Sequence, residues 1–164
     1  MKKWLLLLFV PMCLSAQNVT SLFVTNVYDG DTIHGTNVTG QVCSVRLYGI
    51  DAPELEQPYG TNAKMVLSNY VMNKTVEIIF MGKDPFGRII GVIKWNQSNI
   101  NMLMIVEGMA WYYDIGNKDL NLAYAFRTFQ YEAKIGKVGL WADKNPISPF
   151  QYRSGNFAKW NKKK

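Results

Sequence analysis

Cysteine and histidine are almost missing from this chain of 164 residues, which contains only Cys13, Cys43 and His34. A zinc site needs several Cys or His ligands, and a Ser–His–Asp triad needs a histidine placed beside its partners. The chain has no C-x-x-C pair and no Cys/His cluster, so it lacks the residues for both kinds of site. Cys43 stands in a β-rich stretch and is interpreted as a small buried hydrophobic residue.

A hydrophobic run long enough to span a bilayer is also missing from the start of the chain. The run from Trp4 to about Leu14 follows Lys2 and Lys3 and leads into small residues up to Ala16. It is too short for a membrane span and has the pattern of a secretory signal peptide. We therefore expect residues 1–16 to be cleaved off and the protein to be secreted, periplasmic or held at the cell surface.

Two other interpretations of this start fit the sequence less well. A buried first helix is disfavoured by Pro11, which would break it. A lipoprotein with Cys13 lipidated is disfavoured by the bulky Met12 just before the cysteine. Cleavage near Ala16 removes two lysines and lowers the formal net charge from +6 to +4. It also leaves Cys43 without a partner for an intramolecular disulfide.

Arginine is scarce, and the acidic residues are unevenly spread. Only four of the eighteen basic residues are Arg. Five of the twelve acidic residues fall between positions 27 and 56, where Arg46 is the one basic residue; they are Asp29, Asp31, Asp51, Glu54 and Glu56. Clustered carboxylates repel one another, so a fold that gathers them indicates a bound cation or a reaction that uses them.

The spacing of hydrophobic residues predicts a single α+β domain over residues 17–142. The predicted strands are 21–28, 32–36, 41–50, 76–80 and 88–95, and the predicted helices are 61–72, 101–109 and 120–135. Three strands joined by tight turns, followed by a helix, two strands and two helices, indicate a five-stranded OB-fold barrel with three α-helices. Residues 143–164 end in three lysines and are expected to form a basic, flexible tail.

A small set of charged residues points to phosphodiester hydrolysis. Asp31 lies at the start of one predicted strand and Asp51 at the end of another, so a barrel can bring both to one rim, where hard oxygen ligands suit Ca²⁺. Glu54 follows Asp51 by three residues and can take a proton from water. Arg46 and Arg88 both lie near turns, where their planar groups can hold a phosphate through two hydrogen bonds.

Several of these residues also have plainer interpretations. Asp-Gly-Asp tripeptides are most often solvated turns. Tyr112 and Tyr113 are core residues or, alternatively, a pair that stacks a base near the rim. Arg127 is interpreted as a partner in a surface or interhelical ion pair, and Arg153 as a solvated residue of the basic tail, which adds salt-sensitive attraction to nucleic acid.

Five motifs occur in a fixed order: V-Y-D-G-D-T-I, V-R-L-Y-G-I-D-A-P-E, P-Y-G-x-x-A, D-P-F-G-R and E-G-M-A-W. In this order and spacing they resemble the staphylococcal nuclease family, over about Val19 to Trp141. The resemblance implies an OB-fold barrel with three helices. It also implies a Ca²⁺-dependent enzyme that cleaves DNA and RNA to 3′-phosphate ends and acts as a monomer.

The resemblance also implies roles for individual residues. Asp31 and Asp51 match the family's calcium ligands, and Ala52 stands where the type member has a threonine whose backbone carbonyl binds the metal. Any residue can offer that carbonyl, so this departure is expected to cost little. Glu54 matches the residue described as general base or water-orienter, and the loop between it and Tyr59 is shorter than in the type member. That shortening is expected to change how substrate is held on this side.

The resemblance assigns phosphate binding to Arg46 and Arg88, and it relates Tyr112 or Tyr113 to a tyrosine that stacks near the nucleotide. The main alternative is a non-catalytic OB-fold module that binds nucleic acid or a protein. Such a module is expected to lose acidic or arginine members of the set, and every member is present here. A Ca²⁺-binding structural protein would explain the carboxylates but not the arginines.

Overall fold

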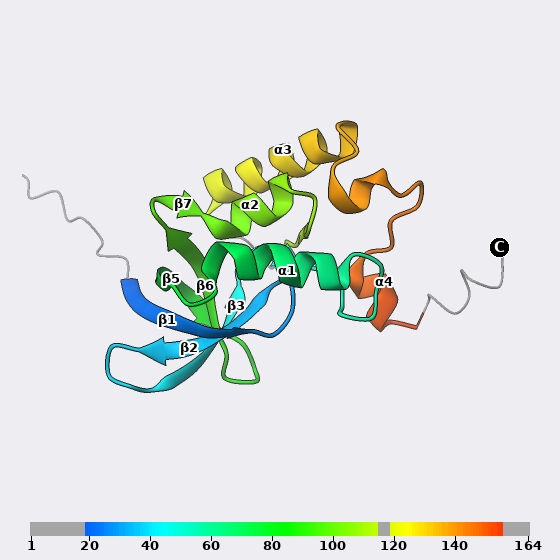
Figure 1. Cartoon of the computed structure of the whole chain (residues 1–164). Helices are drawn as coiled ribbons and strands as arrows, with labels where there is room; N and C mark the ends of the chain where they lie inside the picture. Colours follow the sequence, from blue (N-terminus) through cyan, green and yellow to red (C-terminus); the bar gives the residue numbers. More distant parts are fainter. Residues whose placement is uncertain (1–18, 115–118, 156–164) are drawn as a thin grey trace, which may run out of the picture.

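Five strands form a closed, mixed β-barrel in the computed structural model, which describes residues 19–114 and 119–155 (Figure 1). The strands are β1 (Val19–Val27), β2 (Thr32–Asn37), β3 (Val42–Leu47), β5 (Thr75–Lys83) and β6 (Ile89–Trp95). They are hydrogen-bonded in the order β3-β2-β1-β5-β6, all antiparallel, and the parallel pairing of β3 with β6 closes the barrel. The predicted fold class is therefore confirmed.

Three short strands complete the β-structure. β7 (Ser98–Asn99) extends the sheet beyond β6, and β4 (Ile50–Asp51) pairs with β8 (Trp111–Tyr112) in a separate two-stranded ladder. In that ladder Asp51 lies opposite Trp111. The ladder therefore holds the backbone at Asp51 against β8, a strand that lies about 60 positions later in the sequence.

Helices pack outside the barrel (Figure 1). The longer ones are α1 (Gly60–Val71), α2 (Ile100–Val106) and α3 (Leu120–Ile135), and the short ones are the 3₁₀ helix η1 (Gly139–Ala142) and α4 (Pro149–Arg153). The three predicted helices are present, whereas η1 and α4 were not predicted. Among the described residues, no helix is long and apolar enough to cross a membrane.

The hydrophobic core lies between the inside of the barrel and one side of α1 and α2. Ala63, Leu67 and Val71 of α1 recur at helical spacing and are fully buried, so the period of the sequence matches the packed face. Asn101 of α2 is also fully buried, and its side chain accepts a hydrogen bond from the Ile93 amide and donates to the carbonyls of Tyr48 and Gly91. This side chain therefore ties α2 to the barrel without leaving a buried polar group unpaired.

The third predicted strand, 41–50, was wrong as a single element. It breaks at Tyr48-Gly49 into β3 and β4. Gly49 has φ +74°, and a Cβ there would lie 2.6 Å from the Phe126 ring. Glycine alone adopts this backbone readily and fits against the ring. The bend directs the chain out of the barrel wall, so that Asp51 lies at its rim.

Gly30, in the turn between β1 and β2, is needed because neighbouring residues approach it closely. It is not among the glycines with positive φ, so its backbone conformation does not itself require glycine. A Cβ at this position would instead lie 2.6 Å from the Cβ of Ala63 and 2.7 Å from that of Ala52. Gly30 thus allows the turn, the start of α1 and the end of β4 to approach closely, which places Asp31 beside Ala52.

The predicted signal peptide and the terminal lysines 162–164 lie outside the described residues. The predicted tail begins at residue 143, and its described part contains α4. The helix has clear local causes: the Ser148 side chain accepts a hydrogen bond from the Gln151 amide, the Gln151 side chain accepts one from the Ser148 amide, and Pro149 occupies the first turn. This is a capping box, which stabilises the start of a helix.

Candidate active site

Asp31 is buried where β2 begins, with only 3% of its surface exposed. Its Oδ2 accepts a hydrogen bond from the Ala52 amide (2.9 Å), and its Oδ1 accepts one from the Thr32 hydroxyl (3.1 Å). The preceding Asp29 caps the turn by accepting a hydrogen bond from the Asp31 amide (3.0 Å). These contacts hold the Asp31 carboxylate in one orientation at the rim of the barrel.

Arg46 bridges Asp31 and Asp51, the two aspartates predicted to bind a metal ion. It lies on β3 opposite Thr32 of β2, one residue from Asp31. Its Nη1 is 2.5 Å from Asp31 Oδ1, and its Nη2 is 2.9 Å from Asp51 Oδ1. One guanidinium group spans both carboxylates, so Asp31 and Asp51 converge on a single point although 20 positions separate them in the sequence.

Burial has the largest effect on the pKa values of Asp31 and Arg46. Removal from water raises the pKa of Asp31 from its ordinary value of 3.8 to about 7; the Arg46 charge opposes the rise, and Asp29 and Asp51 add to it. Burial by itself would lower the pKa of Arg46, but Asp31 and Asp51 raise it above its usual value. Arg46 therefore stays charged beside the two carboxylates.

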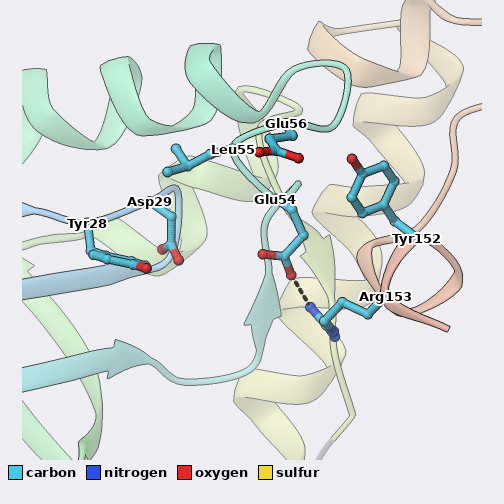
Figure 2. A pocket seen from close by; sticks show the side chains of 7 residues that line it. All are labelled: Tyr28, Asp29, Glu54, Leu55, Glu56, Tyr152 and Arg153. Carbon is cyan, nitrogen blue, oxygen red and sulfur yellow. Dashed lines mark hydrogen bonds and ion pairs between the residues drawn. The ribbon is translucent and has the colours of Figure 1, made fainter. Parts of the chain in front are cut away.

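Glu54 joins this cluster through an arginine that the sequence analysis had not assigned to the site. Arg153 of α4 places its Nη1 2.7 Å from Glu54 Oε1, and its Nη2 lies 2.9 Å from Asp51 Oδ2. Figure 2 shows the contact between Arg153 and Glu54. The interpretation of Arg153 as a solvated tail residue was wrong, because α4 folds back onto the rim of the barrel.

Gln57 joins α4 to the loop that carries Glu54. Its Nε2 donates to the Ile147 carbonyl just before α4 (2.6 Å), and its Oε1 accepts from the Glu54 amide (3.2 Å). Pro149, the first residue of α4, is buried. Two signals in the sequence could have indicated this arrangement: Arg153 is one of only four arginines, and Ser148-Pro149-x-Gln151 is a helix-start pattern.

An open pocket of about 360 Å³ lies beside the cluster. Figure 2 shows Tyr28 and Asp29 on one side of it and Tyr152 and Arg153 on the other, with Glu54 between them. Its remaining lining residues are Leu55 and Glu56. The Glu54 carboxylate thus reaches a space that solvent or a ligand can enter.

Arg88 lies just before β6 and forms a separate ion pair. Its Nε is 2.6 Å from Asp84 Oδ2, and Asp84 Oδ1 accepts hydrogen bonds from the amides of Phe86 and Arg88. In the parallel ladder Arg46 pairs with Ile90, two residues after Arg88. Among the contacts of the described residues, none joins Arg88 to the carboxylate cluster.

Tyr112 and Tyr113 adjoin β4, the strand that ends in Asp51. Tyr112 pairs with Ile50 and packs against Phe126 and Arg127. Tyr113 donates its amide hydrogen to the Gly49 carbonyl (2.9 Å), and its side chain is exposed. Tyr113 has the more accessible ring, and its role in stacking a base stays a prediction.

Comparison with known proteins adds a family to this geometry. The family model described as "Staphylococcal nuclease homologue" matches residues 44–143, more than half of the chain. The protein belongs to the staphylococcal nuclease family. The resemblance inferred from the five motifs is therefore confirmed.

Relatives of this nuclease family, two bacterial and one from a plant, support the same assignment. The chain is 36% identical over 149 residues to a Haemophilus influenzae protein named an uncharacterized endonuclease, covering 91% of this chain and 82% of that one. It is 33% identical over 139 residues to a micrococcal nuclease of Shigella flexneri, covering 79% and 78%. A staphylococcal-like nuclease of Arabidopsis thaliana shares 36% identity over 109 residues, 66% of this chain and 32% of the plant protein.

The donor groups at this staphylococcal nuclease site fit a hard divalent cation. Asp31 and Asp51 offer buried carboxylate oxygens at one point, and the Ile50 carbonyl lies 3.4 Å from the same Arg46 Nη2 that contacts Asp51. Within residues 19–114 and 119–155, no cluster of three or more Asp, Glu, His or Cys side chains is arranged to hold a metal ion. Two carboxylates with carbonyls and water suit Ca²⁺ or Mg²⁺, which accept water ligands readily.

Proposed function

We propose that this protein is a secreted, Ca²⁺-dependent nuclease that hydrolyses phosphodiester bonds of DNA and RNA and leaves 3′-phosphate ends. The observation that carries the proposal is the convergence of Asp31, Asp51 and Arg46 at one rim, next to Glu54 and an open pocket. Secretion rests on the predicted signal peptide, residues 1–16. The protein acts as a monomer, as the family resemblance implies.

In this proposal each residue has a defined task. Glu54 accepts a proton from a water molecule whose oxygen attacks the phosphorus, and the bond from phosphorus to the 5′ oxygen of the next nucleotide breaks. Arg46 neutralises the negative charge that grows on the phosphoryl oxygens, and Arg88 does the same and assists the leaving oxygen. Asp31 and Asp51, with the Ala52 carbonyl, would hold Ca²⁺, which supplies positive charge and a polarised water when bound.

The first experiment measures hydrolysis of single-stranded DNA and of RNA by the mature protein from Gln17. Each substrate is incubated with Ca²⁺, with Mg²⁺ and with a chelator, and the product ends are tested for removal of phosphate by a 3′-phosphatase. We expect cleavage that requires Ca²⁺ and gives phosphatase-sensitive ends. DNA that stays bound but intact in Ca²⁺ would instead support the non-catalytic binding module.

The raised pKa of Asp31 predicts an unusual dependence of stability on pH. The folded, cation-free protein keeps the Asp31 proton up to about pH 7, whereas the unfolded chain releases it near its ordinary pKa of 3.8. Between these values the folded state binds more protons, so Asp31 lowers the free energy of unfolding as pH rises, by at most about 1.4 kcal/mol per pH unit.

Urea unfolding in the presence of a chelator, from pH 4.5 to 7.5, tests this expectation against Asp31→Asn. The variant cannot ionise at this position, so the stability of wild type relative to the variant should fall steadily across the range. A difference that stays flat with pH would show that Asp31 is ionised in the folded protein throughout.

A further inference from the structure

Arg153 contacts both oxygens of the Asp51 carboxylate. Its Nη2 is 2.9 Å from Oδ2 and its Nη1 is 3.2 Å from Oδ1, while the same Nη1 lies 2.7 Å from Glu54 Oε1. Arg46 also donates to Asp51 Oδ1. Every oxygen that Asp51 can offer to a cation is therefore engaged by an arginine, in the paired geometry in which guanidinium and carboxylate groups bind most strongly.

A divalent cation and two guanidinium groups cannot all approach one carboxylate closely, because their positive charges repel one another. The Asp51 side chain is only 4% exposed, so it offers little room for a third partner. Arg46 is held on a central barrel strand and pairs with Asp31 as well. The Arg153 side chain is 44% exposed and extends from a five-residue helix at the edge of a pocket. Arg153 is the arginine that can move away.

We propose that Arg153 is a further residue of the active site, which contacts Asp51 and Glu54 in the cation-free enzyme and competes with the divalent cation for Asp51 and with the attacking water for Glu54. Its departure frees Asp51 for the cation and Glu54 for the attacking water in one movement. Arg153 thereby sets the cation concentration at which the enzyme becomes active. The inference rests on the proposed Ca²⁺-dependent function.

The contacts of α4 indicate that the side chain can move while the helix stays. The backbone just before α4 is fixed by the Gln57–Ile147 hydrogen bond, and the helix starts with its own capping box and the buried Pro149. None of these contacts involves Arg153. Substitution of Arg153 should therefore leave the barrel and α4 folded, so that the effect on cation binding can be measured separately.

The test measures Ca²⁺ binding to the mature chain by calorimetry, for wild type, Arg153→Gln, Arg153→Lys and the control Arg127→Gln. Loss of a partly exposed competing ion pair should tighten the binding of Ca²⁺ by Arg153→Gln about three- to tenfold. Arg127 pairs with Asp114 on the surface, so Arg127→Gln should bind like wild type. Lys keeps the positive charge but cannot make the bidentate contact with Asp51. Arg153→Lys should therefore also bind Ca²⁺ more tightly than wild type.

A second readout follows the Arg153 guanidinium by NMR, with its signals assigned through their loss in Arg153→Gln. Titration with Ca²⁺ should move these signals toward those of an unpaired guanidinium group. Equal or weaker Ca²⁺ binding by Arg153→Gln, or unmoved signals at saturation, would overturn the inference while Ca²⁺-dependent cleavage still stood. If neither the wild type nor any variant binds Ca²⁺, the proposed calcium dependence and this inference are both wrong.

Discussion

Replacement of Glu54 by Gln is expected to lower kcat about 10²- to 10⁴-fold, the range found when a positioned general base is removed. Gln has the same shape and can still accept a hydrogen bond from Arg153, but it cannot take a proton from water. The carboxylates of Asp31 and Asp51 are unchanged and a hydrogen bond to Arg153 is kept, so protein stability should stay close to wild type. Single-turnover cleavage of a labelled DNA strand at saturating enzyme measures the chemical step directly.

The matched control is Glu132→Gln, which makes the same change on the exposed surface of α3. It should cleave like wild type, because Glu132 lies on a helix outside the carboxylate cluster. A Glu54→Gln enzyme within threefold of the wild-type rate would show that Glu54 does not accept the proton. Its position beside Arg153 would then serve only to hold that arginine.

Arg46→Ala is expected to impair both catalysis and folding. Loss of one donor to the phosphoryl oxygens should lower kcat about 10²- to 10³-fold. The same change leaves Asp31 and Asp51 buried without the charge that bridges them, and breaking a buried ion pair on one side costs about 3–5 kcal/mol of stability. Cleavage kinetics and urea unfolding with chelator measure the two effects separately.

Two further variants separate charge from geometry at this position. Arg46→Lys keeps the positive charge but cannot span both carboxylates, so it should recover part of the stability and little of the activity. Arg127→Ala removes an exposed arginine that pairs with Asp114 and should leave both quantities unchanged. Arg46→Ala with full activity would remove Arg46 from the proposed mechanism, whatever its effect on stability.

The barrel could be predicted from the sequence because its signals are local. Alternating residues and turn glycines mark the strands, and helical spacing of Ala63, Leu67 and Val71 marks α1. The order of these elements then leaves few ways to close a small barrel. The cluster of Asp31, Asp51 and Glu54 could be predicted for a related reason: each lies next to a strand end or turn, and strand ends meet at a barrel rim.

Other features of the site depend on contacts between segments far apart in the sequence, and only the tertiary structure shows them. The sequence by itself determined the five barrel strands apart from the break at Gly49, the three main helices, the family and the acidic residues that gather at the rim. Burial raises the pKa of Asp31, and no local pattern in the sequence shows how far water is excluded from its carboxylate. Arg153 lies 99 positions from Glu54, and its use depends on where α4 packs. No periodic pattern in the sequence marks an ion pair between an exposed arginine and an acidic residue far away in the chain. Only the folded structure therefore places Arg153 in the site.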